Sequence, residues 1–365
     1  MKEGGKMKYA LIGCGRIAPN HIKAALANRG SGLEVAAICD LVPEKMTSLA
    51  EKFDLGGTAQ YTDYRAMLRD VRPDLVAVAT ESGSHAAVAL DCIAAGCNVI
   101  IEKPIALSMS DARKVITAAE TAGVVVSANH QNRFNRSVQL ARHAENDGSL
   151  GRILHGSVHV IWGRDRKYYS SGSWRGTWEQ DGGALMNQCI HGIDLLRWML
   201  GGEVEEVTAM TARLNHDYIE AEDLGMALLR FRSGALGMVE GTVNTYGNSL
   251  EETLYLFGSN GTVKLGGKAA NKVEFWSIAG DARTAEDLAD ALPDTIYGLG
   301  HTSLYTDVID AIKTGRAPYV TARDGMEALE LVLAIYKSAA EGRPVKLPLE
   351  DCSTLDFAGR FGLTD

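Results

Sequence analysis

The fold of this chain is decided by one short stretch, Lys8-Tyr9-Ala10-Leu11-Ile12-Gly13-Cys14-Gly15-Arg16-Ile17-Ala18. The apolar residues before Gly13 predict a buried strand, and the residues after the second glycine predict the start of a helix. The first glycine permits a tight turn, the second lets the backbone approach a pyrophosphate, and the alanine allows close packing of helix against strand. The N-terminus of that helix offers N–H groups to phosphates. The pattern predicts a dinucleotide loop whose cofactor contacts come from Gly13, Gly15, Arg16 and Ile17.

The second expected strand supports this interpretation. It covers Leu33–Cys39 and ends at Asp40, which lies 25 positions after Gly15. In dinucleotide-binding folds a carboxylate about 20 residues beyond the glycine loop binds the ribose hydroxyls. Such a carboxylate repels a 2′-phosphate, so NAD is favoured over NADP as the cofactor. The alternative is that Asp40 is an ordinary turn residue.

Strands and helices alternate up to residue 130. Three more strands are expected after the first two, at Asp74–Thr80, Asn98–Glu102 and Val124–Ala128. Five strands separated by helices predict an α/β fold, a Rossmann dinucleotide-binding domain over residues 7–130. Longer segments then show the apolar alternation of an open, largely antiparallel sheet. They are Ile153–Trp162, Glu203–Leu214, Leu224–Phe231, Leu236–Val243 and Glu252–Phe257, and two helices, about His301–Thr314 and Ala322–Glu341, close the chain. Residues 131–365 are expected to form an α+β domain for substrate binding and oligomerisation.

A charged pair lies at the C-terminal end of the strand Asn98–Glu102, in the sequence Glu102-Lys103-Pro104. In an open α/β sheet this end faces the ligand crevice. The proline fixes its own φ and turns the chain, which holds Lys103 in one place. A lysine whose charged form is disfavoured by burial can take part in proton transfer. The alternative is a solvated lysine in a turn.

A second group of polar residues occurs where a helix is expected, from Ala184 onward. Asn187, His191 and Asp194 fall at i, i+4 and i+7, which places them on one helical face. A polar stripe on an otherwise apolar helix predicts an active-site wall. The alternative is a hydrogen-bonded core histidine.

Composition limits the class of protein. The 365 residues are 46% hydrophobic and 23% charged, as in soluble globular proteins, and the net charge of −9 argues against nucleic-acid binding. No apolar run reaches the roughly 18 residues of a membrane helix, so no membrane partner is expected. Six cysteines show neither a CxxC motif nor metal-ligand spacing, which predicts no metal site and a reducing, cytoplasmic compartment. An apolar face on the open sheet favours a homodimer or homotetramer.

These motifs together resemble the Gfo/Idh/MocA family of NAD(P)-dependent sugar and cyclitol oxidoreductases, over about Lys8 to Pro348. The resemblance rests on the glycine loop, His85 after Ala79-Thr80, Glu102-Lys103-Pro104 and the helix Asn187 to Asp194. It implies that Lys103 and His191 flank the substrate hydroxyl and the nicotinamide. The segments Trp174–Trp178 and Leu185–Gln188, with Gly300-His301, are similar to a narrower group, the UDP-N-acetylglucosaminuronate 3-dehydrogenases.

The resemblance also extends the expected site. Cofactor contacts are expected from Thr80, His85, Glu102, Lys103 and Trp162, in addition to the glycine loop and Asp40. Substrate contacts are expected from Lys103, Arg164, Tyr168, Arg175, Asn187 and His191, with the arginines, Tyr168 and Trp162 near an anionic or bulky sugar group.

Two residues depart from the family pattern. Asn187 stands where an aspartate is common, and Asp181 replaces the first of three glycines before the helix. Because asparagine cannot take a proton, His191 becomes the expected base, with Lys103 and Asn187 as the other catalytic residues. An aspartate at position 187 is expected to keep activity and to raise the apparent pKa of His191.

The expected function is hydride transfer between nicotinamide and a hydroxyl-bearing carbon of a sugar, nucleotide-sugar or cyclitol. Two alternatives remain open within this fold. One is an NAD-dependent glycosidase that oxidises its substrate transiently, and the other is a non-catalytic dinucleotide sensor.

Overall fold

A computed structural model describes residues 6–289 and 300–361 of the chain. The chain forms two compact units. The first unit contains Met1–Ala106, Ser110–His130 and His301–Met326, and the second contains Leu107–Met109, Gln131–Gly300 and Glu327–Asp365.

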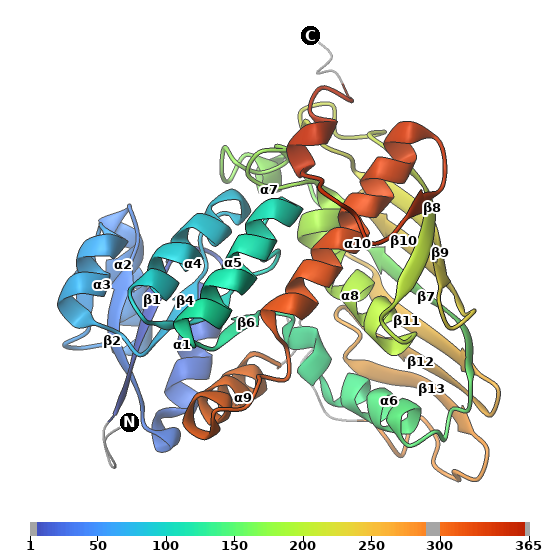
Figure 1. Ribbon diagram of the computed structural model, residues 1–365, viewed down its shortest axis with the longest axis horizontal. Helices are drawn as coiled ribbons and strands as arrows, with labels where there is room; N and C mark the ends of the chain where they lie inside the picture. The colour runs from blue at the N-terminus through green and yellow to red at the C-terminus, as the bar shows by residue number, and fades with distance from the viewer. Residues whose placement is uncertain (1–5, 290–299, 362–365) are drawn as a thin grey trace. The chain divides into compact units, whose positions relative to one another are not determined.

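The first unit is built on a six-stranded parallel sheet with the strand order β3-β2-β1-β4-β5-β6. The strands are β1 Met7–Ile12, β2 Leu33–Cys39, β3 Ala59–Tyr61, β4 Leu75–Val78, β5 Asn98–Ile101 and β6 Val126–Ala128. The helices of this unit surround the sheet (Figure 1): α1 Ala18–Ala27, α2 Pro43–Phe53, α3 Tyr64–Val71, α4 His85–Ala94, α5 Met109–Ala122 and α9 Gly300–Thr314. Chain order reverses between β1 and β4, which is the point where such sheets bind ligands.

The second unit is built on an eight-stranded sheet with the order β13-β12-β11-β7-β10-β9-β8-β14. Only one neighbouring pair in it, β7 with β10, is parallel. Its strands are β7 Ile153–Ile161, β8 Val204–Ala212, β9 Leu224–Phe231, β10 Leu236–Thr242, β11 Glu251–Gly258, β12 Gly261–Gly266, β13 Lys272–Ile278 and β14 Val345–Lys346. Its α- and π-helical segments are α6 Arg136–Asn146, α7 Arg166–Tyr169, a π turn Leu185–Cys189 and α8 Ile190–Met199, followed by α10 Ala322–Glu341, which crosses the boundary between units. Short 3-10 helices cover Gln131–Phe134 and Thr354–Phe357.

One face of this second sheet supports α8, and within the described residues the other face is open at strands β8–β10. Helix α8 packs on β7, β10 and β11 (Figure 1), and Gly192 allows the approach, since a Cβ there would lie 2.8 Å from Val158. Because strand side chains alternate between faces, the neighbouring positions on β8–β10 point away from the helix. Large apolar side chains are exposed there: Met210, Met226, Leu228, Leu236 and Met238.

The structure confirms the expected fold class and corrects several details. The parallel sheet has a sixth strand, β3, and the second sheet gains β12, β13 and β14, none of which the sequence predicted. The helix expected from Ala184 begins as a π turn, so Asn187 and His191 are not one regular α-helical turn apart. Residues 301–326 group with the first unit, whereas the sequence assigned all of 131–365 to the second domain. The reason is a set of buried contacts from α9 to β1 and α1. None of the helices within the described residues is long and apolar enough to cross a membrane.

Candidate functional site

Candidate residues occur in both units, and in the first they lie at the carboxyl ends of the parallel strands. Gly13 follows β1 with φ +97°, and a Cβ on it would lie 2.3 Å from the carbonyl oxygen of Ala79. Only glycine fits this turn, so the loop keeps the close backbone geometry that a dinucleotide needs. Gly15 and Arg16 are exposed on this loop, Ile17 is half-buried, and α1 begins at Ala18.

Asp40 fixes the shape of the same loop. Its carboxylate accepts hydrogen bonds from the backbone N–H of Cys14 (2.8 Å) and of Val42 (2.9 Å). The ammonium of Lys45 lies 3.7 Å from the carboxylate. The negative charge expected at the end of β2 is therefore held beside the glycine loop, where it suits a ribose better than a 2′-phosphate.

His85 joins the loops that follow β4 and β5. Its Nδ1 lies 2.7 Å from the carbonyl oxygen of Pro104, and its Nε2 lies 3.1 Å from that of Thr80. The imidazole is buried, and burial lowers its pKa despite these two carbonyls. In this geometry His85 links the loop after β4 to Pro104, the residue that follows Lys103. The cofactor contact expected of His85 stays a prediction.

Glu102 is the centre of a buried polar network. Its Oε1 accepts a hydrogen bond from Nε2 of His21 at 3.0 Å and one from the amide of Asn129, and its Oε2 accepts from the backbone N–H of Lys103 at 3.1 Å. The network continues from His21 to the Tyr305 hydroxyl (2.7 Å), which contacts the Tyr9 hydroxyl (2.9 Å). Burial alone would raise the pKa of Glu102, but the hydrogen bond and charge of His21, with Lys103, hold that pKa well below its usual range.

His301 of α9 completes this cluster. Burial lowers its pKa to about 3, so the imidazole is neutral. His21, Glu102 and His301 each offer one potential metal-ligand atom, and these three atoms lie within 4.8 Å of one another, which is compatible with a metal site. Both ring nitrogens of His21 already have hydrogen-bond partners, however, and a metal ion would have to displace one of them. The geometry therefore favours a hydrogen-bond network that holds the residue preceding Lys103.

In the second unit, the candidate residues cluster around the π turn and α8. His191 is buried, and its Nε2 lies 3.4 Å from the amide nitrogen of Gln131 in the short helix Gln131–Phe134. Asp194 forms a fully buried, bidentate ion pair with Arg133 at 2.6 and 2.7 Å. This ion pair anchors the short helix Gln131–Phe134, which also contacts His191, to α8, and gives Asp194 a structural role.

Three of the residues expected to bind substrate form one group. The guanidinium of Arg164 lies 4.9 Å from the ring centroid of Tyr168, and that of Arg175 lies 4.4 Å from it. The Tyr168 hydroxyl accepts hydrogen bonds from Arg175 (2.6 Å) and from the amide of Gln188 (2.8 Å). Trp162 is buried beneath Arg164, with a cation–π distance of 4.9 Å. The sequence missed Gln188, although it is the neighbour of Asn187.

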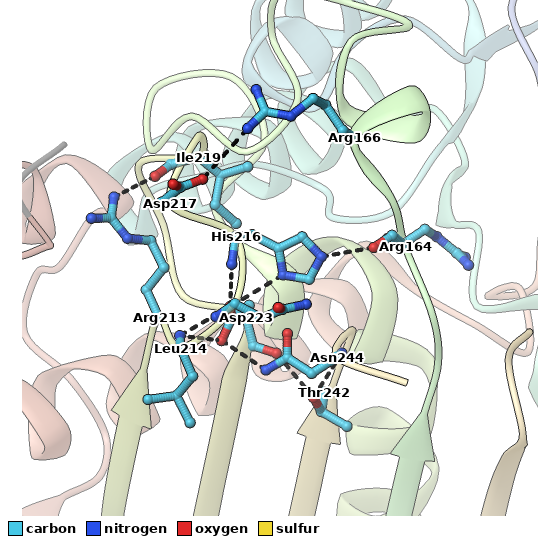
Figure 2. A network of polar contacts seen from close by, with 11 residues as sticks. Arg164, Arg166, Arg213, Leu214, His216, Asp217, Ile219, Asp223, Thr242 and Asn244 are labelled. Carbon is cyan, nitrogen blue, oxygen red and sulfur yellow. Dashed lines mark hydrogen bonds and ion pairs between the residues drawn. The ribbon is translucent and has the colours of Figure 1, made fainter. Parts of the chain in front are cut away.

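A further network, which the sequence did not predict, holds Arg164 in place (Figure 2). The buried carboxylate of Asp223 accepts hydrogen bonds from the backbone N–H groups of Leu214, Asn215 and His216, at 2.8 to 3.0 Å. It also contacts Nδ1 of His216 at 3.1 Å, and Nε2 of His216 lies 2.7 Å from the carbonyl oxygen of Arg164. The network ties the segment after β7, which bears the substrate candidates, to the loop between β8 and β9.

Comparison with known proteins agrees with this geometry. Residues 7–130 match the family model described as "Oxidoreductase family, NAD-binding Rossmann fold", and residues 146–347 match "Oxidoreductase family, C-terminal alpha/beta domain". The D-apiose dehydrogenase of Paraburkholderia graminis is 30% identical over 94% of this chain and 90% of its own length. The myo-inositol 2-dehydrogenase of Thermotoga maritima is 29% identical over 93% of this chain and 98% of its own.

A solved structure is similar at a higher identity. The WlbA dehydrogenase from Bordetella pertussis, in complex with NADH and UDP-GlcNAcA, is 38% identical, with a TM-score of 0.88 over 95% of this chain and 99% of that one. These comparisons confirm the expected resemblance, the NAD cofactor and the class of sugar, nucleotide-sugar or inositol dehydrogenase.

Proposed function

The chain belongs to the Gfo/Idh/MocA oxidoreductase family, and we propose that it oxidises a ring hydroxyl of a nucleotide-linked sugar acid of the UDP-N-acetylglucosaminuronate class. The observation that carries this proposal is that the guanidinium groups of Arg164 and Arg175 both lie against the Tyr168 ring, 4.9 and 4.4 Å from its centroid. Two guanidinium groups held in place by an aromatic ring suit a carboxylate or a diphosphate, because arginine binds such groups in a bidentate way. Similarity to a dehydrogenase that binds UDP-GlcNAcA supports the same class.

The proposed reaction breaks one C–H bond and one O–H bond of the sugar. The cofactor takes the hydride, and a protein side chain takes the proton. NAD, when bound, accepts the hydride from the sugar carbon. We assign the hydroxyl proton to His191, with Lys103 stabilising the developing carbonyl oxygen and Asn187 orienting the sugar hydroxyls. The products are the keto sugar, NADH and one proton held by His191, so atoms and charge balance.

The test is the rate of NADH formation with a panel of substrates. We expect turnover with the nucleotide-linked sugar acid, and kcat/KM at least about 10-fold lower with the matching neutral nucleotide sugar, since the lost charged hydrogen bonds are worth about 1.5–3 kcal/mol. Arg175→Met is expected to abolish that preference. Lys167→Met removes one positive charge from an exposed residue nearby and is the matched control.

Other outcomes of the same panel contradict the proposal. Faster turnover of inositols or free aldoses would assign the enzyme to another substrate class of this family. Released aglycone without net NADH would indicate the glycosidase, and binding of NAD without any turnover would indicate the sensor.

We also propose that the open face of the second sheet pairs with another copy of the chain, as a homodimer or homotetramer. Met210, Met226 and Leu228 are 82%, 49% and 62% exposed on adjacent strands, a larger apolar surface than isolated residues provide. A monomeric mass by light scattering would exclude this pairing.

The six free, buried cysteines support the reducing, cytoplasmic location expected from the sequence.

A further inference from the structure

The two residues that depart from the family pattern contact each other. Asp181 is only 1% exposed, and its Oδ1 accepts a hydrogen bond from the side-chain amide of Asn187. Its Oδ2 accepts a second hydrogen bond from the backbone N–H of Gly176 at 2.7 Å. A carboxylate can only accept hydrogen bonds, so the amide group that faces it must be the NH₂ of Asn187. Asp181 therefore sets the direction in which this asparagine points.

The surroundings of Asp181 are charged and titratable. Its negative charge raises the pKa values of Tyr168 and Tyr169, after the larger effect of burial on both, and it contributes to the raised pKa of Glu222. Arg164 and Arg175 oppose this effect at Tyr168. Asp181 thus places one carboxylate near Tyr168, one of the residues proposed to bind the sugar acid. The positive charges of Arg164 and Arg175 offset the negative charge of this carboxylate at Tyr168.

We propose that Asp181 is the positioning residue of Asn187, and that positions 181 and 187 work as one carboxylate–amide pair. The pair needs one carboxylate and one amide, and the two groups can exchange places. This proposal rests on the proposed role of Asn187 at the substrate, and not on which sugar is oxidised.

The pair changes what an aspartate at position 187 should do. From the sequence, Asn187→Asp is expected to keep activity. With Asp181 in contact, that variant brings a half-buried carboxylate against a buried one. Like charges so close cannot both ionise. One of them must hold a proton, and the two titrate as a coupled unit. Asn187→Asp is therefore expected to lose activity near neutral pH and to acquire a new limb in its pH–rate profile.

The experiment is a cycle of four enzymes: the parent, Asp181→Asn, Asn187→Asp and the reciprocal double variant. Asparagine at 181 can still accept from Gly176, so the turn there is retained. Each single variant is expected to lower kcat/KM at neutral pH by about 10-fold or more, on the scale of groups that orient a reacting substrate. The double variant restores a carboxylate–amide pair. Its kcat/KM is expected to be at least about 10-fold higher than the value obtained by multiplying the two single losses. It should also lack the new pH limb.

Two measurements make the outcome decisive. The same cycle is followed by thermal unfolding, which needs no substrate, and by kinetics with any sugar or inositol that yields NADH. Coupling in stability without coupling in kcat/KM would mean that Asp181 is only structural, and multiplicative kinetics would likewise overturn the proposal. Glu179→Gln removes the same charge from an exposed position two residues away and should change neither measurement.

Discussion

Two buried acid–imidazole pairs, one in each unit, are satisfied in different ways. In the first unit, Glu102 lies 3.0 Å from His21 and accepts its other hydrogen bonds from Asn129 and the N–H of Lys103. In the second unit, Asp223 lies 3.1 Å from His216, but most of its hydrogen bonds come from consecutive backbone N–H groups of one loop. The first pair thus joins side chains from distant parts of the sequence, whereas the second organises local backbone.

This difference predicts different consequences when each acid is lost. Removing Asp223 leaves the buried N–H of His216 and the part-buried N–H groups of Leu214 and Asn215 without their acceptor. Donors that lose their acceptor in this way lower the free energy of unfolding. Removing the charge of Glu102 leaves few backbone groups unpaired, but it changes the environment of the adjacent Lys103. We therefore expect the second pair to matter most for stability and the first for catalysis.

The largest expected effect is that of Asp223→Ala. We expect it to lower the free energy of unfolding by about 3–5 kcal/mol, the scale for removing one partner of a buried ion pair. Urea unfolding measures this change directly. Asp217→Ala is the control, because Asp217 lies in the same loop with a side chain 69% exposed and forms only a 3.6 Å surface pair with Arg166. Equal, small losses in both variants would mean that the Asp223 network does not organise the loop.

The next effect is that of Glu102→Gln, which keeps the size of the side chain and removes its charge. We expect kcat to fall by about 10–100-fold, or about 1.4–2.7 kcal/mol of transition-state stabilisation, while the free energy of unfolding changes less than in Asp223→Ala. The measurements are kcat and the NAD dissociation constant of the same samples. If NAD binding weakens as much as kcat falls, Glu102 contacts the cofactor, as the sequence-based prediction had it.

The sequence predicted the parts of this molecule whose signals are local. The glycine loop, Asp40 and Glu102-Lys103-Pro104 each combine a short motif with a strand end, and both strand and motif are visible within a few residues. The networks behind them were not predictable in this way. His21 and Tyr305 are 284 positions apart, and no periodicity connects them. Strand β3 has only three residues, too few to show alternation. The apolar residues of the π turn at Leu185–Cys189 do not distinguish it from the first turn of an α-helix.

The contact between Asp181 and Asn187 lies between the local motifs that the sequence predicts and the long-range networks that it does not predict. Both residues were visible in the sequence as departures from a family pattern, six positions apart. Their pairing depends on the turn at Gly176 and on the π turn, which sequence periodicity does not reveal. Two unusual residues close together in sequence were the available signal.

The smallest expected effect is a pH dependence of opposite sign in the two units. In the first unit, burial lowers the pKa of His301 to about 3. A base whose folded pKa is lowered contributes stability above its unfolded pKa, about 6.5, and this stability is lost as the pH falls. At pH 5 the loss from His301 is about 2 kcal/mol at most. In the second unit, burial raises the pKa of Glu252 to about 8. Burial lowers the pKa of His216, but its hydrogen bonds to Asp223 and to the Arg164 carbonyl, with the charge of Asp223, together raise that pKa. Groups with raised folded pKa values contribute stability at low pH that is lost as the pH rises through those values.

Acidification from pH 8 to pH 5.5 is therefore expected to loosen the first unit and tighten the second. Hydrogen exchange followed by peptide mass, corrected for the intrinsic rate at each pH, reports on both units in one sample. His301→Gln should flatten the response of peptides from β1, α1 and α9, and Glu252→Gln should flatten that of β7 and β11, each without changing the other unit. The two variants serve as controls for each other, because each removes one titrating group from one unit. A response of the same sign in both units, unchanged by either variant, would show that the pH dependence does not arise from these buried groups, and the contrast between the two networks would then concern geometry alone.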